Sequence, residues 1–161
     1  MMSTADIEKI TKVLASMMHY ELALSDFYNQ CADIWQEDQA FWQTLAYAEV
    51  RHAENIQKMR EIVTKKQERF EAGRPFSPIA LDTAMAWLQD NTRRLTSRTF
   101  SHEEMLIIAR DIENSILESH YAEIVKTADS EYQTLMKDIL AQTYEHRKSI
   151  QEKIDKVKTK A

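Results

Sequence analysis

Carboxylate and imidazole side chains fall at the centre of the apolar faces that the long helices of this sequence are expected to form. When residues are placed at about 100° per residue, Glu21 and Glu49 each lie in the middle of an apolar stripe. His52 shares the stripe of Glu49, and His146 is the central polar residue of another stripe. Glu113 lies on the flank of a fourth. Burying a carboxylate without a partner is costly, so these groups need a shared counter-charge.

A bound pair of divalent or trivalent metal ions would supply that counter-charge, because bound cations are often the largest local charges in a site. Glu49 and His52 are spaced i and i+3, so both lie on one helix face and can converge on one ion. Carboxylate with imidazole suits iron, manganese or zinc, and a single cysteine, Cys31, excludes a multi-cysteine site. The alternative is a structural cluster in which Glu21 and Glu49 pair with core histidines or with Arg60.

The helix breakers of this sequence gather near the middle of the chain, which contains one glycine and two prolines in total. They are Gly73, Pro75 and Pro78. So few turn-forming residues argue against a β-rich fold, which needs them at short intervals. The breakers therefore divide an all-α chain into two halves of similar length.

Apolar periodicity and capping signals predict four long helices and one short helix. Ser101 with Glu104 has the pattern of a capping box at the start of the third long helix. Ser130 with Gln133 repeats that pattern at the start of the last helix. The predicted helices span residues 4–36, 38–69, 77–94, 101–127 and 130–157.

Short connections make the two long helices of each half antiparallel neighbours. The chain is then two αα-hairpins, 4–70 and 101–157, joined by a crossover over 71–100 that carries the short helix. This organisation predicts the ferritin-like variant of the four-helix bundle, in one domain that spans residues 1–161. A simple up-down bundle with a decorated middle loop is the alternative that periodicity leaves open.

The motifs on the four long helices resemble those of the rubrerythrin-like branch of the ferritin-like superfamily. The matching stretches are Glu21-Leu-Ala-Leu-Ser-Asp-Phe27-Tyr28, Glu49-Val-Arg-His52, Ile112-Glu113-Asn-Ser-Ile-Leu-Glu-Ser-His-Tyr121 and Leu140-Ala-Gln-Thr143-Tyr-Glu-His146. The pattern of that family is two half-sites, each with a Glu from one helix and a Glu-x-x-His from the next. The resemblance implies a non-haem diiron site in which Glu49 is placed to bridge. The implied iron ligands are Glu21, Glu49, His52, Glu113 and His146.

The second Glu-x-x-His of the family pattern is incomplete, because Thr143 stands where its Glu would be. The neighbouring Glu145 points about 100° away from His146 on the helix wheel and replaces the missing ligand poorly. Water, His120 or Glu145 after a rotation could fill the open position, or one metal position could be weak.

Three further assignments complete the expected site. Glu113 is preferred over Asn114 as a ligand, because Asn114 falls on the face away from the apolar stripe. Tyr28, one stripe position from the carboxylate of the first helix, could hydrogen-bond a ligand of the metal. His19 and His102 lie off the stripe centres and are expected to be solvated.

The resemblance implies metal-centred redox chemistry, namely peroxide or oxygen reduction or Fe(II) oxidation, as in a peroxidase or ferroxidase. Manganese or zinc could replace iron. The family's rubredoxin-like cysteine module has no counterpart here, so electrons would come from a separate donor protein, and the family implies a homodimer. The competing hypothesis is a non-enzymatic helical interaction or storage protein with a degenerate or single-metal site.

The net charge and the hydropathy of the sequence argue against two kinds of partner, nucleic acids and membranes. A net charge of −5 counts against a nucleic-acid partner. No apolar run approaches the roughly 18 residues that a membrane-spanning helix needs, so no membrane partner is expected. The first residues show neither a basic patch nor an apolar stretch, so the expected location is the cytoplasm.

Overall fold

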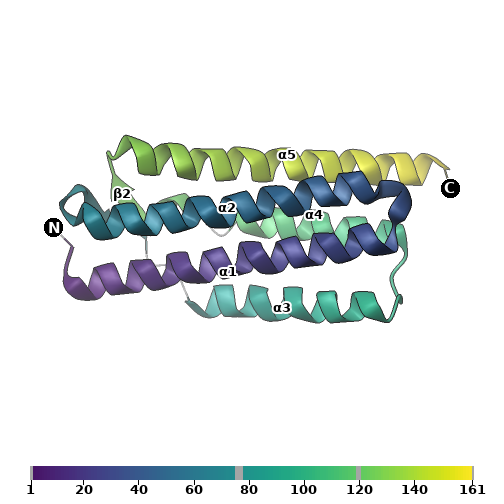
Figure 1. Cartoon of the computed structure of the whole chain (residues 1–161), viewed down its shortest axis with the longest axis horizontal. Helices are drawn as coiled ribbons and strands as arrows, with labels where there is room; N and C mark the ends of the chain where they lie inside the picture. The colour runs from purple at the N-terminus through teal and green to yellow at the C-terminus, as the bar shows by residue number, and fades with distance from the viewer. Residues whose placement is uncertain (1, 75–77, 119–120, 161) are drawn as a thin grey trace.

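The computed structural model describes residues 2–74, 78–118 and 121–160, and of residues 116–118 it describes the backbone. Almost all of these residues are helical, which confirms the all-α prediction (Figure 1). The helices are α1 (Thr4–Ile34), α2 (Gln39–Lys65), α3 (Pro78–Thr96), α4 (His102–Glu118) and α5 (Ser130–Lys160). Ser77, the predicted start of the short helix, and His120, a predicted substitute ligand, lie outside the described residues.

Local capping interactions define where the helices of both hairpins begin. The predicted capping box of α4 is confirmed: Ser101 N donates to Glu104 Oε2 (2.8 Å), and Ser101 Oγ accepts from Glu104 N (3.1 Å). The predicted cap of α5 is wrong. Asp129 Oδ1 accepts from Tyr132 N (3.0 Å), so Asp129 caps this helix. Gln133 turns back instead, and its Nε2 donates to the carbonyl oxygen of a preceding residue (2.7 Å).

The third long helix ends at Glu118, although periodicity predicts that it continues to residue 127. A 3-10 turn (Tyr121–Glu123) follows it and leads into strand β2 (Val125–Thr127). Strand β2 pairs antiparallel with β1 (Phe70–Ala72), which directly follows the first hairpin. Pairing with a distant segment therefore overrides the helical pattern there.

The single glycine of the chain allows this strand pairing. Gly73 N donates to Ile124 O (3.0 Å), and a Cβ at Gly73 would collide with the backbone of Glu123. Only a residue without a side chain lets the two backbones approach so closely.

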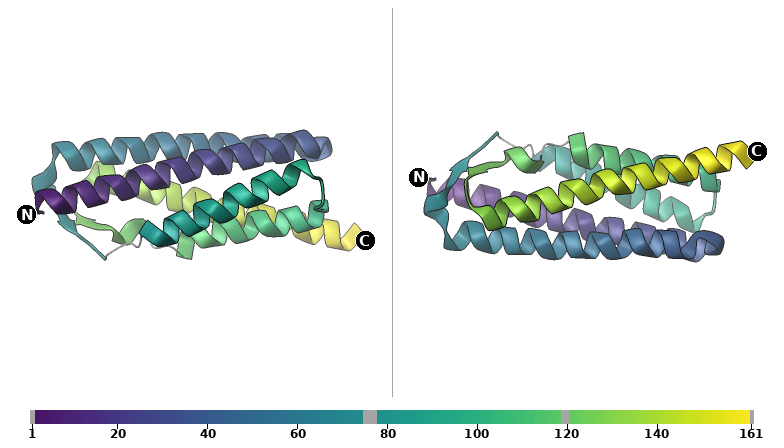
Figure 2. Two further views of the ribbon diagram at one scale, coloured as in Figure 1. Left: turned by 90° about the horizontal axis from the view of Figure 1, so that it is seen from below. Right: turned by 90° about the horizontal axis from the view of Figure 1, so that it is seen from above.

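The two hairpins are joined by a connection that runs the length of the bundle (Figures 1 and 2). Trp35, just after α1, stacks on His102 at the start of α4, and Lys153 near the end of α5 pairs with Asp38 just before α2. The β1–β2 pair lies at the opposite end, and α3 packs along α1 between the two ends. As a result α2 and α4 run in the same direction.

The apolar faces of α1, α2, α4 and α5 meet in one buried core, which α3 extends on the side of α1. Among the described residues, no helix combines the length and apolarity needed to cross a lipid bilayer. The core is therefore shared by helices from both hairpins, and the inward polar side chains lie within it.

Candidate metal centre

Five carboxylate and imidazole side chains meet in the middle of the bundle, two from α2 and one each from α1, α4 and α5. They are Glu21, Glu49, His52, Glu113 and His146, and we call them the Glu/His cluster. The three carboxylates are fully buried, His52 is 1% exposed, and the side chain of His146 is 12% exposed. The structure thus brings together all five residues that the sequence singles out.

Glu49 lies at the centre of the Glu/His cluster and contacts both imidazoles. Its Oε2 is 3.1 Å from His52 Nδ1, and its Oε1 is 3.1 Å from His146 Nδ1. Glu49 belongs to two groups of three residues, one with Glu21 and His52 and one with Glu113 and His146. Within each group, one candidate ligand atom from each residue lies within 4.8 Å of the others. The cluster could therefore hold a metal ion in each group.

The first group contains a carboxylate that accepts no hydrogen bond from the described residues. Among these residues neither oxygen of Glu21 has a hydrogen-bond partner, and its Oε2 is 3.9 Å from His52 Nδ1. His52 Nε2 lies 2.7 Å from Gln142 Oε1. Because an amide oxygen can only accept a hydrogen bond, the neutral form of His52 carries its hydrogen on Nε2. The lone pair of neutral His52 is then on Nδ1, which faces the carboxylates. Gln142 is absent from the sequence prediction, and its position on α5, four residues before His146, is the only signal that could have found it.

The second group is held by a tyrosine from α1. The predicted hydrogen bond from Tyr28 is present, and its hydroxyl donates to Glu113 Oε1 (2.6 Å). Glu113 Oε1 lies 3.5 Å from His146 Nδ1, while Glu113 Oε2 has no hydrogen-bond partner in the part of the chain that the structure describes. The neighbouring Asn114 instead accepts a hydrogen bond from Arg147 (3.2 Å). The structure thus brings Glu113, and not Asn114, into the cluster.

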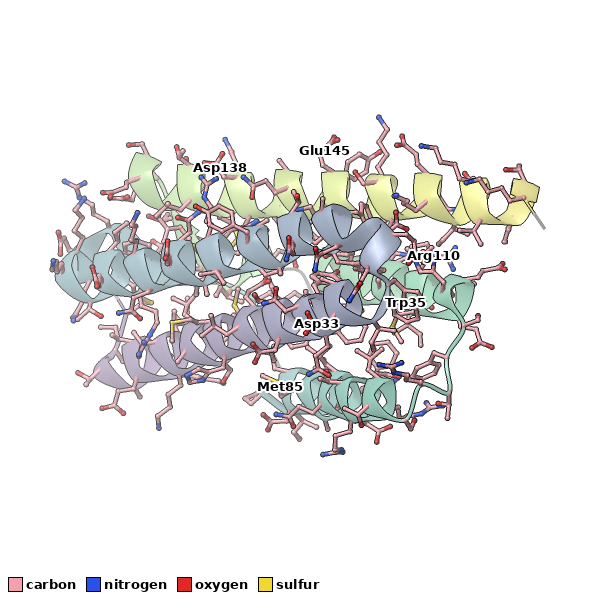
Figure 3. The ribbon with its side chains drawn as sticks, turned by 45° about the vertical axis from the view of Figure 1, so that its right-hand side comes forward. Asp33, Trp35, Met85, Arg110, Asp138 and Glu145 are labelled. Atoms are coloured by element: carbon pink, nitrogen blue, oxygen red, sulfur yellow. The ribbon has the colours of Figure 1, made fainter. Side chains whose placement is uncertain are left out.

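The second group lacks a carboxylate at the position of Thr143. Thr143 is fully buried, and its hydroxyl donates to the carbonyl oxygen of Ile139 on its own helix (2.8 Å). Glu145 is exposed and lies on the outer side of α5, as predicted (Figure 3). Among the described residues, the second group therefore consists of Glu49, Glu113 and His146 alone.

Burial and mutual contact shift the proton affinities of the Glu/His cluster. Burial and the adjacent Glu49 raise the pKa of Glu21 well above its ordinary value. Burial disfavours the charged imidazoles, but contacts with Glu21 and Glu49 raise the pKa of His52 to about 11. Contacts with Glu113 and Glu49 likewise raise the pKa of His146 to about 9. Burial and the charge of Glu113 favour protonation of Glu49, but hydrogen bonds from its neighbours outweigh them and lower its pKa.

Pairing within the protein satisfies only part of the cluster. Glu49 is paired with both histidines, and Glu21 lies within ion-pair distance of His52 (3.9 Å), as the structural alternative expects. Arg60, the other partner in that alternative, donates to Gln57 instead (2.9 Å). With respect to residues 2–74, 78–118 and 121–160, both oxygens of Glu21 and one of Glu113 remain without a hydrogen bond. Buried polar atoms are rarely left so, and a cation in each group would together satisfy all three.

We expect metal binding at neutral pH to release protons, because ligands must be deprotonated to bind. With pKa values of about 11 for His52 and about 9 for His146, both imidazoles carry an extra proton at pH 7. Metal affinity should therefore rise as the pH increases from 7 to about 9, where His146 loses its proton. It should rise further toward pH 11, where His52 loses its proton. Titration calorimetry in buffers of different ionisation enthalpy should show a net release of about two protons or more. Binding without proton release would contradict this description of the cluster.

Comparison with models of protein families, with curated protein sequences and with solved structures finds no match to this chain. Its function is therefore inferred from the helices and from the Glu/His cluster that they position.

Proposed function

We propose that this chain is a ferritin-like protein of the rubrerythrin type that binds two iron ions in the Glu/His cluster. The observation that carries the proposal is the position of Glu49, which belongs to both groups of the cluster. Each group consists of Glu49, one further carboxylate and one imidazole. One carboxylate can thereby bridge two ions. The parallel course of α2 and α4, with a crossover between the hairpins, also agrees with a ferritin-like bundle.

The donor set suits iron, and also manganese or zinc. Bound as Fe(II), the pair would supply the electrons that reduce peroxide or oxygen. The chain's own residues position the ligands: Gln142 orients His52, and Tyr28 donates to one oxygen of Glu113, while the other accepts no hydrogen bond from any residue described. Fixing ligands by such outer hydrogen bonds preserves both their orientation and their basicity.

The number of irons per chain tests the proposal. The protein is reconstituted anaerobically with Fe(II) and desalted, and its iron is counted by mass spectrometry. We expect about two irons per chain, one for each group of the cluster. Peroxide should then oxidise the bound iron faster than it oxidises Fe(II) in buffer. A chain that retains no iron would overturn the proposal.

A second candidate function is storage or helical interaction with a single metal ion. Thr143 favours it, because the second group lacks the carboxylate that the family pattern places there. About one iron per chain, with no peroxide turnover, is the result that would support this alternative.

Electron supply and assembly are further parts of the main proposal. The electrons would come from a separate donor protein, and the chain would act as a homodimer. These parts rest on the resemblance to rubrerythrins. Sedimentation of the purified protein tests the dimer directly.

A further inference from the structure

An unbroken series of aromatic contacts leads from the Glu/His cluster toward the surface. Tyr28, whose hydroxyl donates to Glu113 (2.6 Å), has its ring centroid 5.8 Å from that of Trp42 on α2. The ring of Trp42 lies 6.5 Å from the ring of Trp35, which follows the end of α1. Tyr28 and Trp42 are fully buried, whereas Trp35 is partly exposed at the α1–α2 turn (Figure 3).

The environment of each ring suits transfer of a single electron. A tyrosine gives up an electron readily only if its phenolic proton can leave, and Glu113 Oε1 is placed to accept that proton. A tryptophan can be oxidised while keeping its proton, and no described residue is placed to accept a proton from the buried Nε1 of Trp42. Trp42 can therefore pass the charge on without a proton acceptor of its own.

At the outer end of the series, Trp35 contacts a histidine, His102, that the sequence predicts to be solvated. His102 is largely buried: it stacks on Trp35 with ring centroids 5.2 Å apart, and its Nε2 lies 3.3 Å from Asp38 Oδ2. It also contacts Trp42, at 6.4 Å. The expectation that His102 is solvated is wrong, because the start of α4 packs against the α1–α2 turn.

We propose that Tyr28, Trp42 and Trp35 form a relay that carries single electrons between the protein surface and the Glu/His cluster. For its use in the cell, the relay rests on the proposed redox function of the cluster. Iron bound in the cluster would, in its oxidised form, take one electron from Tyr28, whose phenolic proton would pass to Glu113 Oε1. Trp42 then reduces the tyrosyl radical, which recovers the proton, and Trp35 reduces Trp42. A one-electron donor of the ascorbate type, meeting the exposed edge of Trp35, supplies the electron that completes the transfer.

The relay can be tested in metal-free protein, so the result does not depend on iron binding. A photogenerated ruthenium(III) polypyridyl complex in solution removes one electron from exposed aromatic residues, and transient absorption follows the tryptophanyl and tyrosyl radicals. The exposed phenols Tyr47 and Tyr144 (69% and 50% exposed) are first replaced by phenylalanine, which prevents their direct oxidation. In this background we expect a tryptophanyl radical that decays as a tyrosyl radical appears.

Three variants in the same background decide whether the relay exists. Tyr28→Phe should abolish the tyrosyl radical, and Trp42→Phe should do the same while the tryptophanyl radical persists. Trp87→Phe is the matched control, since Trp87 lies on α3 and is 44% exposed, and it should leave the tyrosyl yield unchanged.

Each other outcome overturns the relay. No tyrosyl radical in the background protein, or an unchanged yield in Trp42→Phe, would leave the aromatic series as core packing alone. If Trp42→Phe does not fold, as judged by circular dichroism, a substitution at the partly exposed Trp35, Trp35→Phe, replaces it with the same expected loss. The two proposals are tested independently. If the relay fails, the number of irons per chain is unaffected, and if the chain binds no iron, the radical yields in the metal-free protein are unaffected.

Discussion

Replacing Glu49 with glutamine should remove both metal ions from the chain, because both groups of the Glu/His cluster share this carboxylate. Glutamine keeps the size of the side chain but loses the negative charge that attracts a cation. Each metal position would then retain one carboxylate and one imidazole. After anaerobic reconstitution with Fe(II), the iron content should fall from about two per chain to almost none.

Two further substitutions and a control make the Glu49→Gln result specific. His52→Gln should remove only the first ion and His146→Gln only the second, so each should retain about one iron. Glu54→Gln, at an exposed position on the same helix, should retain both. Two irons in Glu49→Gln would show that this carboxylate does not bridge.

The metal-free form of Glu49→Gln should also be less stable. The substitution removes the partner of both imidazoles, and breaking a buried ion pair costs about 3 kcal/mol. Denaturant unfolding measures this loss, and circular dichroism shows that the helices remain. If the cluster is only a structural polar network, this loss of stability is the whole effect and the unaltered protein binds no iron.

The helices and their inward carboxylates could be predicted from the sequence because both follow from local rules. A period of 3.6 residues places Glu21 and Glu49 on buried faces whatever the tertiary arrangement. The capping box at Ser101 involves residues three apart in the chain, so its partners are visible in the sequence. Local patterns were therefore enough to locate the four long helices, and to show that the carboxylates of the cluster lie on their buried faces.

Features that depend on distant segments could not be predicted in the same way. The helical pattern continues past Glu118 without a glycine or proline, but residues 125–127 pair with β1 instead of forming helix. The contact of His52 with Gln142, and that of His102 with Trp35, depend on how neighbouring helices are rotated. A helix wheel describes one helix at a time and contains no such information.

The largest gain in metal affinity is expected from Thr143→Glu. The new carboxylate would lie three residues before His146, the spacing that already brings Glu49 and His52 to one face of α2. Thr143 is fully buried, so the longer side chain would enter the bundle and not the solvent. We expect affinity for the second ion to rise by at least about tenfold, or about 1.4 kcal/mol. Competition with a chelator of known affinity measures the change.

The same variant should be less stable than the unaltered protein when both are metal-free. A fourth buried carboxylate beside three others is costly, and a loss of about 3 kcal/mol would lower the melting temperature by about 10 °C in a chain of this size. Thr143→Gln adds the same volume without the charge, so it should cost less stability and leave the second affinity unchanged. A metal centre thus predicts opposite effects of Thr143→Glu with and without iron. A purely structural cluster predicts the same destabilisation in both conditions.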